Sequence, residues 1–110
     1  MSDAPEPNGR LYADDEDDVV TAGPRDLRIV NKKGLHARAS ARFVEVVNAH
    51  DAVVLVEKDG EEVSGTDLLG LLMLAGTRGS IITVSAAGVD AAKVVDALGA
   101  LVSSGFGEEG

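Results

Sequence analysis

The sequence contains no cysteine and few aromatic residues, and these absences limit both the chemistry and the core that it can have. Without cysteine, the chain forms no disulfide and no thiolate nucleophile. Aromatic residues account for 3% of the chain and hydrophobic residues for 45%, so we expect a core of valine, leucine, isoleucine and alanine. No apolar run approaches the ~18 residues of a transmembrane helix, and the acidic N-terminus is unlike a secretory signal. We therefore expect one globular domain in the reducing cytoplasm, with no membrane contact.

Basic residues are also scarce, and the acidic residues are unevenly placed. Ten lysines and arginines stand against 19 aspartates and glutamates, for a formal net charge of −9 at pH 7. Binding to nucleic acid needs a basic patch, so we exclude nucleic acid as a partner. The acidic run over residues 14–18 repels itself, and we expect residues 1–24 to form a disordered acidic tail. Two roles stay open for this tail, a solvated extension that aids solubility and an arm that docks on a basic surface.

Beyond the tail, strand and helix patterns alternate in the order βαββαβα. Strands are predicted from residue 26 onward, over 53–56, over 61–64 and over 81–85, and helices over 37–49, 68–74 and 90–104. The dipeptide Asp59-Gly60 predicts a hairpin between the second and third strands, and we expect Thr66 or Asp67 to cap the short middle helix. We therefore predict an α+β domain over residues 25–106, with one antiparallel sheet covered on one face by helices, and a disordered end over 107–110.

His36 stands where the first predicted strand gives way to the first predicted helix, within residues 34–40 (GLHARAS). The first amides of a helix are unpaired and the helix dipole is positive there, so the amides of Ala37 and Arg38 favour an anion. A neutral imidazole is a nucleophile near physiological pH, and the planar guanidinium of Arg38 matches phosphate oxygens. These residues indicate a site for a phosphoryl group on His36, although a plain cap or surface histidine has the same spacing.

Other kinds of site find little support in the sequence. The chain has two histidines, and neither they nor any close pair of acids has the spacing of metal ligands. We therefore expect no metal and no cofactor. The G-x-S-x-G motif of a hydrolase nucleophile is absent as well. His50 follows the first predicted helix, where a positive charge is favourable, and we assign it no function.

Residues 34–41 resemble the active-site motif of HPr, the histidine-containing phosphocarrier of the bacterial phosphoenolpyruvate-dependent phosphotransferase system. The similarity extends over residues 26–104 and includes Asn31 before the motif, the turn from Gly76 to Gly79 and the element order. The resemblance implies an HPr-like open-faced β-sandwich, in which a four-stranded antiparallel sheet is covered on one face by three helices.

The resemblance also implies a function for these residues. His36 is then expected to accept a phosphoryl group on Nδ1 from phosphorylated enzyme I and to pass it to a histidine of an EIIA protein, with Arg38 stabilising the phosphate. Such a phosphocarrier completes no catalytic turnover by itself, so we expect a carrier and not an enzyme. We also expect the carrier to be a monomer. The implied docking surface beside His36 consists of Ala41, Leu68, Leu69 and Leu72, with Leu71 and Leu74 turned into the core.

Asp67 departs from the resemblance, because it stands where many members of the family carry a regulatory serine at the start of the second helix. An aspartate cannot be phosphorylated by a serine kinase, so the serine regulation is not carried over. Three interpretations stay open: a natural helix cap, a natural mimic of phosphoserine and an engineered substitution. We favour the cap, because aspartate is among the best N-cap residues.

Two branches of phosphocarrier and one non-carrier class remain as functional hypotheses. We favour a regulatory, nitrogen-related relay over sugar uptake, because basic side chains are sparse on the expected docking surface, as at Glu45 and Gly70, and charge complementarity tunes partner choice. Residues 32–40 also resemble regulatory members from proteobacteria. The alternative is an HPr-fold module that regulates a partner by docking alone, against which His36 and Arg38 argue. Enzyme I, an EIIA protein and other regulatory proteins are the expected partners.

Overall fold

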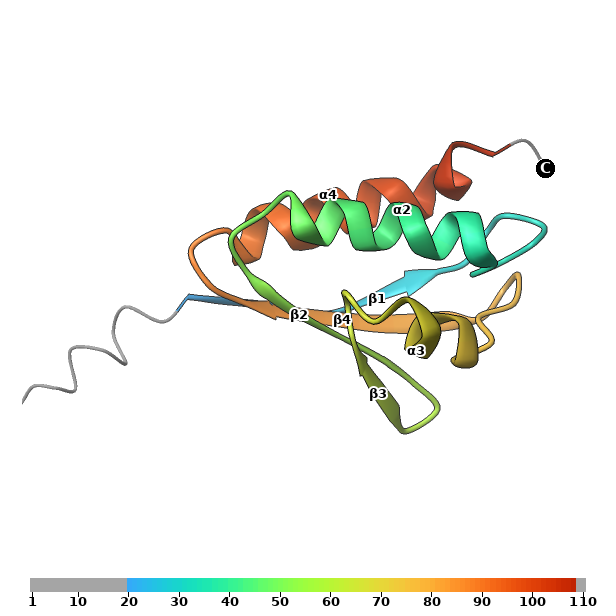
Figure 1. Cartoon of the computed structure of the whole chain (residues 1–110), viewed down its shortest axis with the longest axis horizontal. Coiled ribbons are helices and arrows are strands. Elements are labelled where there is room, and N and C mark those ends of the chain that lie inside the picture. Colours follow the sequence, from blue (N-terminus) through green and yellow to red (C-terminus); the bar gives the residue numbers. More distant parts are fainter. Residues whose placement is uncertain (1–19, 109–110) are drawn as a thin grey trace, which may run out of the picture.

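A four-stranded antiparallel sheet with helices on one face dominates the structure, a computed structural model that describes residues 20–108 (Figure 1). The elements follow the chain as β1 (Thr21–Arg28), α2 (Ala37–Asn48), β2 (Val53–Lys58), β3 (Glu61–Ser64), α3 (Leu68–Met73), β4 (Ile81–Ala87), α4 (Ala91–Ser103) and the short 3₁₀ helix η1 (Gly105–Gly107). The order βαββαβα and the cover of three α-helices confirm the predicted open-faced sandwich.

The sheet has the strand order β1-β4-β2-β3, and every neighbouring pair is antiparallel. Asp59 and Gly60 connect β2 to β3 with φ angles of 54° and 85°, which is the backbone of a type I′ hairpin turn. The pair Lys58 and Glu61 closes this two-residue loop. The hairpin predicted from the dipeptide is therefore confirmed.

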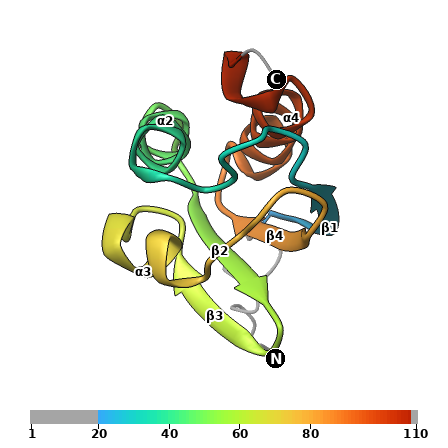
Figure 2. The ribbon, with the colours of Figure 1, turned by 90° about the vertical axis from the view of Figure 1, so that its right-hand side faces the viewer.

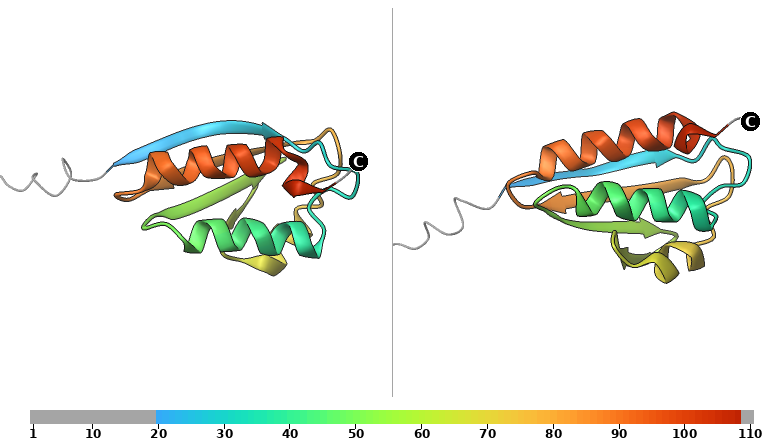
Figure 3. Two further views of the ribbon diagram at one scale, coloured as in Figure 1. Left: turned by 90° about the horizontal axis from the view of Figure 1, so that it is seen from above. Right: turned by 45° about the horizontal axis from the view of Figure 1, so that its top comes forward.

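The core lies between the sheet and the helices and is almost entirely aliphatic. Alternate residues of the two central strands point into it, each 0–2% exposed: Val54, Val56, Ile82 and Val84. Figures 2 and 3 show α2 and α4 side by side over this face, where they add residues at helical spacing: Ala39, Phe43, Val47, Val94, Val95, Leu98 and Val102. Val46 of α2 and Leu101 of α4 are only partly buried at the margin of this core. None of the helices between residues 20 and 108 has the length and hydropathy that spanning a bilayer requires.

The boundary predicted for the acidic tail is wrong at its C-terminal end. Strand β1 begins at Thr21, so residues 21–24 belong to the sheet, and Thr21 pairs with Ala87 of β4. The pairing register shifts between Ala22 and Arg25. An irregularity of this kind on an edge strand tolerates Gly and Pro, and it also breaks the alternation by which a strand is recognised. The acidic run lies in residues 1–19, outside the described residues.

The predicted disordered end over 107–110 also needs correction in its first half. Gly107 completes η1, and Glu108 contacts the loop before α2. The reason is Phe106, whose side chain is 0% exposed and holds this segment against the core. Residues 109–110 lie outside the described part of the chain.

Candidate functional site

His36 is the N-cap residue of α2, at the positive end of the helix. Its backbone is extended (φ −73°, ψ 179°), and its carbonyl accepts the first helical hydrogen bond from the amide of Ser40 at 2.8 Å. The imidazole makes no cap hydrogen bond to the helix. The amides of Ala37 and Arg38 in the first turn therefore keep their capacity to bind an anion.

The loop that carries His36 is fixed against the connection between α3 and β4. The amide of Leu35 donates to the carbonyl of Gly76 at 2.8 Å, and the Leu35 side chain is buried. Gly34 has a φ of 64°, and a Cβ at this position would collide with the Gly76 carbonyl oxygen. Glycine is thus required both by the backbone angle and by the close approach of two chain segments, and the approach sets where His36 projects.

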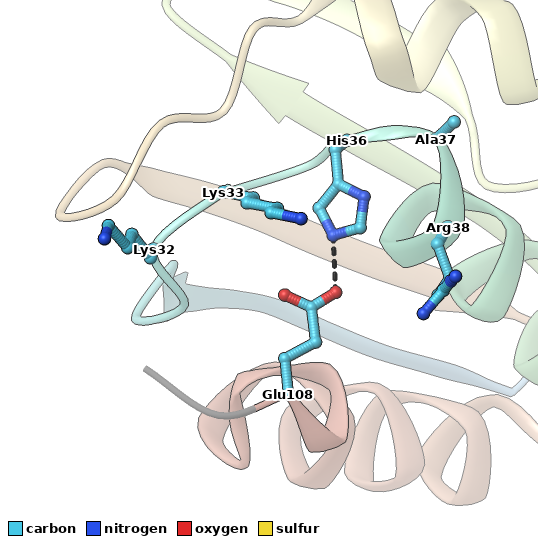
Figure 4. A pocket seen from close by; sticks show the side chains of 6 residues that line it. All are labelled: Lys32, Lys33, His36, Ala37, Arg38 and Glu108. Carbon is cyan, nitrogen blue, oxygen red and sulfur yellow. Dashed lines mark hydrogen bonds and ion pairs between the residues drawn. The ribbon is translucent and has the colours of Figure 1, made fainter.

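Glu108 forms the most direct contact with the candidate nucleophile, and sequence reasoning missed it. Its Oε2 accepts a hydrogen bond from Nε2 of His36 (Figure 4). Its Oε1 accepts a second hydrogen bond, at 3.0 Å, from Nδ2 of Asn31. The other ring nitrogen of His36, Nδ1, lies on the side of the ring that faces α2 (Figure 4). One ring nitrogen is therefore occupied by a carboxylate, and the other faces the helix start.

Glu108 reaches His36 because the chain turns sharply after α4. Gly105, Phe106 and Gly107 all have positive φ angles, of 69°, 59° and 73°, a run that directs the chain back over the start of α2. Arg42 of α2 donates through Nη1 to the Phe106 carbonyl at 2.9 Å. A sequence signal for this turn does exist: one aromatic residue set between two glycines, which suggests a buried anchor within an otherwise polar end.

Positive charge predominates around the His36 ring. Lys32, Lys33, Ala37 and Arg38 line a pocket together with His36 and Glu108, and Figure 4 shows the ring between Lys33 and Arg38. The hydrogen bond from Asn31 is the main cause that lowers the pKa of the Glu108 carboxyl below its usual 4.5. The hydrogen bond to His36 and the positive charges nearby act in the same direction, against partial burial. Glu108 is therefore ionised near neutral pH, and the pocket holds three cationic side chains and one carboxylate.

The second histidine lies in a different setting. Nδ1 of His50 donates to the Val46 carbonyl at 2.7 Å, at the far end of α2. It thus shares neither the lysines nor the helix N-terminus that surround His36. Among residues 20–108 there is no cluster of three or more histidine, cysteine or acidic side chains that could hold a metal ion.

The expected docking residues lie mainly on α3, beside the start of α2. Leu68 and Leu69 are 41% and 65% exposed, whereas Ala41 and Leu72 are half-buried. Leu71 and Leu74 are buried in the core, as predicted. Met73 is 71% exposed on the same short helix and was not anticipated. An apolar surface of this kind, next to a basic pocket, is typical of a transient protein interface.

Asp67 caps α3. Its Oδ1 accepts a hydrogen bond from the amide of Gly70 at 2.9 Å, and its backbone is extended, as N-cap geometry requires. Of the two residues expected as the cap of α3, the structure therefore shows Asp67 and not Thr66.

Comparison with known proteins assigns the class of protein. The family described as "PTS HPr component phosphorylation site" matches residues 24–104. A crystal structure of HPr from Thermoanaerobacter tengcongensis is similar with a TM-score of 0.72 and 36% identity, covering 83% of this chain and 97% of that chain. The chain belongs to the HPr family, the phosphocarrier proteins of the phosphotransferase system.

Both branches of the family appear among the relatives. The phosphocarrier protein HPr of Cupriavidus necator is 39% identical over 84 residues, which cover 76% of this chain and 94% of that protein. The phosphocarrier protein NPr of Shewanella violacea is 38% identical over 89 residues, which cover 81% of this chain and 98% of that protein. The NPr relatives fit the regulatory branch favoured from the sequence, and the HPr relatives have nearly equal identity.

Proposed function

We propose that His36 accepts a phosphoryl group on Nδ1 from phosphorylated enzyme I and passes it to a histidine of an EIIA protein. The observation that carries this proposal is the placement of the His36 ring. Its Nε2 is occupied by Glu108, whereas Nδ1 faces the start of α2 with its unpaired amides. The protein is a carrier that alternates between two states and is not an enzyme by itself.

The transfer exchanges one phosphorus–nitrogen bond for another. Nδ1 of His36 attacks the phosphorus atom of the donor phosphohistidine, and the bond to the donor nitrogen breaks with its electron pair returning to the donor ring. Because the bond formed is of the same kind as the bond broken, the equilibrium is close to balanced and the protein's contribution is positioning and charge stabilisation. Arg38 and the amides of Ala37 and Arg38 supply that stabilisation, and Lys32 and Lys33 add positive charge to the pocket.

Docking is proposed to occur on the surface around the pocket. Ala41, Leu68, Leu69 and Leu72 provide apolar contact area beside the positive side chains. A partner that carries a phosphohistidine and an acidic rim around it matches this combination of charge and apolar area. The carrier binds each partner transiently, because it must dissociate from the donor before it reaches the acceptor.

We place the carrier in a regulatory relay in the cytoplasm and propose that it acts as a monomer. Its similarity to NPr proteins supports this choice, as does the sparse positive charge on the α2 and α3 faces, where Glu45 and Gly70 stand. The branch is tested by comparing phosphoryl acceptance from a sugar-type enzyme I and a nitrogen-type enzyme I. Faster acceptance from the nitrogen-type donor is expected, and the reverse order assigns the protein to sugar uptake.

The experiment for the carrier function mixes the protein with phosphoenolpyruvate and its cognate enzyme I and follows phosphorus NMR. An acid-labile phosphohistidine is expected in the wild type and in His50→Ala, and no label is expected in His36→Ala. Label that persists in His36→Ala moves the site to another residue. A wild-type protein that binds enzyme I but takes no label is a docking module without phosphotransfer.

A further inference from the structure

We propose that Glu108, held in place by Asn31, is a positioning residue that selects the tautomer of the neutral His36 ring. In the selected tautomer Nε2 carries the hydrogen and Nδ1 presents its lone pair. The inference rests on the proposed function in one respect only, the need for Nδ1 as the nucleophile. The tautomer itself is a property of the unphosphorylated protein and is measured without any partner.

The first argument is the hydrogen-bonding capacity of the two groups. An ionised carboxylate has no hydrogen to donate, and a neutral imidazole has one N–H and one acceptor nitrogen. Because Nε2 of His36 contacts Oε2 of Glu108, Nε2 must be the donor. The single hydrogen of the neutral ring is thus on Nε2, and the lone pair is on Nδ1.

The second argument is that Asn31 fixes the carboxylate in this position. Asn31 is 1% exposed, and its Nδ2 donates both to the Gly34 carbonyl at 2.9 Å and to Oε1 of Glu108 at 3.0 Å. Turning the amide over would place Oδ1 against two acceptors, so the orientation of Asn31 is determined. Glu108 is thus aligned by a buried donor that also holds the backbone of the loop before His36. This is the arrangement by which a carboxylate orients a functional histidine in many proteins.

The third argument is charge development during transfer. As Nδ1 bonds to phosphorus, the ring gains positive charge while the hydrogen on Nε2 stays in place. A carboxylate on that hydrogen stabilises the charged ring, in the same role as the buried aspartate of a catalytic triad. Lys32, Lys33 and Arg38 line the same pocket. Their positive charges outnumber the single negative charge of Glu108, so the pocket is still not anionic when a phosphoryl group arrives.

A competing interpretation makes Glu108 a gate. Its negative charge would then repel the incoming phosphoryl group, and its removal would accelerate acceptance. Both interpretations use the same contact, but they give opposite changes in rate. Only the positioning role changes the location of a hydrogen on the ring.

The decisive variant is Glu108→Gln, because Asn31 dictates how the new amide is oriented. The amino group of Asn31 takes the amide oxygen, so the new –NH₂ group points at Nε2 of His36. Nε2 must then accept, which moves the ring hydrogen to Nδ1 and removes the nucleophilic lone pair. Glu108→Ala removes the constraint without reversing it. Glu62→Gln, which changes the same kind of side chain at an exposed position of β3, is the matched control.

The test records ¹H–¹⁵N correlation spectra of the His36 ring at mildly alkaline pH, where a histidine is neutral, and the initial rate of phosphoryl acceptance. We expect the Nε2–H form in the wild type and in Glu62→Gln, the Nδ1–H form in Glu108→Gln, and a mixture in Glu108→Ala. Acceptance by Glu108→Gln is expected to fall by about tenfold to a hundredfold, by analogy with the loss of a partner that orients a metal-binding histidine.

Two results overturn the inference: a tautomer that is the same in all four proteins, and faster acceptance in Glu108→Gln, which identifies a gate. Failure of the proposed function gives a different result. A wild-type protein that takes no phosphoryl group refutes the carrier function, while the ring spectra still decide whether Glu108 selects the tautomer. Backbone spectra of each variant verify that the fold is intact.

Discussion

The carboxylate of Glu108 lies against the imidazole of His36, although 72 residues separate the two in sequence. The contact depends on three further features: the turn after α4, the buried side chain of Phe106 and the hydrogen bond from Asn31. The site is therefore assembled from both ends of the described domain. Each of these features leads to a measurable expectation.

Phe106 anchors the segment that carries Glu108, so Phe106→Ala is expected to affect both stability and the site. Its side chain is 0% exposed, and truncation of a buried phenylalanine costs about 3–5 kcal/mol. Urea unfolding measures the loss, and the His36 ring spectrum is expected to change as in Glu108→Ala. Val89→Ala, at a position that is 70% exposed, is the control and should leave both unchanged. A stability loss below about 1 kcal/mol would contradict this account of the C-terminal turn.

Gly34→Ala is expected to destabilise the loop before His36. The new Cβ would collide with the Gly76 carbonyl, and the φ of 64° is unfavourable for alanine. We expect a loss of about 1–3 kcal/mol, the usual cost of such backbone strain. Gly60→Ala has a comparable φ of 85° but no atom within 4 Å of the new Cβ. It is therefore the matched control, and an equal loss in both variants would show that the contact with Gly76 contributes nothing.

Arg38→Lys tests whether a planar guanidinium is needed or only a positive charge. Lysine keeps the charge but loses the fork of donors that matches phosphate oxygens. We expect the initial rate of phosphoryl acceptance to fall about tenfold, which corresponds to one charged hydrogen bond. Arg78→Lys, exposed in the loop between α3 and β4, should retain the wild-type rate. A wild-type rate in Arg38→Lys would reduce the role of Arg38 to general electrostatics.

Leu69→Asp tests the docking surface on α3. Leu69 is 65% exposed, so the change should leave the fold intact while it places a charge on the apolar surface of α3. We expect the Kd for enzyme I to rise about tenfold or more, as for an interface anchor. Val89→Asp is equally exposed, at 70%, in the connection between β4 and α4 and away from α3 (Figure 1). Unchanged affinity in Leu69→Asp would move the docking surface elsewhere.

The lowered pKa of Glu108 predicts a pH dependence of stability. A carboxyl whose folded-state pKa lies below its usual 4.5 stabilises the folded state fully above that value. The contribution is lost as the pH falls through the folded-state pKa. The difference in unfolding free energy between wild type and Glu108→Ala should therefore shrink as the pH falls below 4.5 and the carboxyl takes up a proton. Urea unfolding in this acidic range measures it, and a difference that grows below pH 4.5 would contradict the sign of the linkage.

The sequence predicted the regular part of the fold because its signals are local. The pattern of residues 37–49 indicated α2, the Asp59-Gly60 pair indicated the hairpin, and Thr66 or Asp67 indicated the cap of α3. Each signal depends on residues a few positions apart, and each is confirmed. The position of His36 at the start of a helix followed from the same kind of reasoning.

The contact with Glu108 could not be predicted, because an aromatic residue between two glycines indicates a buried anchor but not which side chain the next residue meets. A polar end with three glycines in its last six residues has the composition of a frayed terminus, and only the burial of Phe106 shows otherwise. The start of β1 was predicted at residue 26, whereas the strand begins at Thr21. The reason is related, because the register shift between Ala22 and Arg25 hides the alternation of the first residues. In both segments one long-range contact outweighs an unfavourable local pattern.

The most direct test of the central claim is to identify the ring nitrogen that carries the phosphoryl group. Uniformly ¹⁵N-labelled protein, phosphorylated by enzyme I and phosphoenolpyruvate, is examined by NMR for coupling between phosphorus and the ring nitrogens. We expect the coupling at Nδ1 of His36, with the hydrogen retained on Nε2. Coupling at Nε2 of His36, or at either ring nitrogen of His50, would contradict the account.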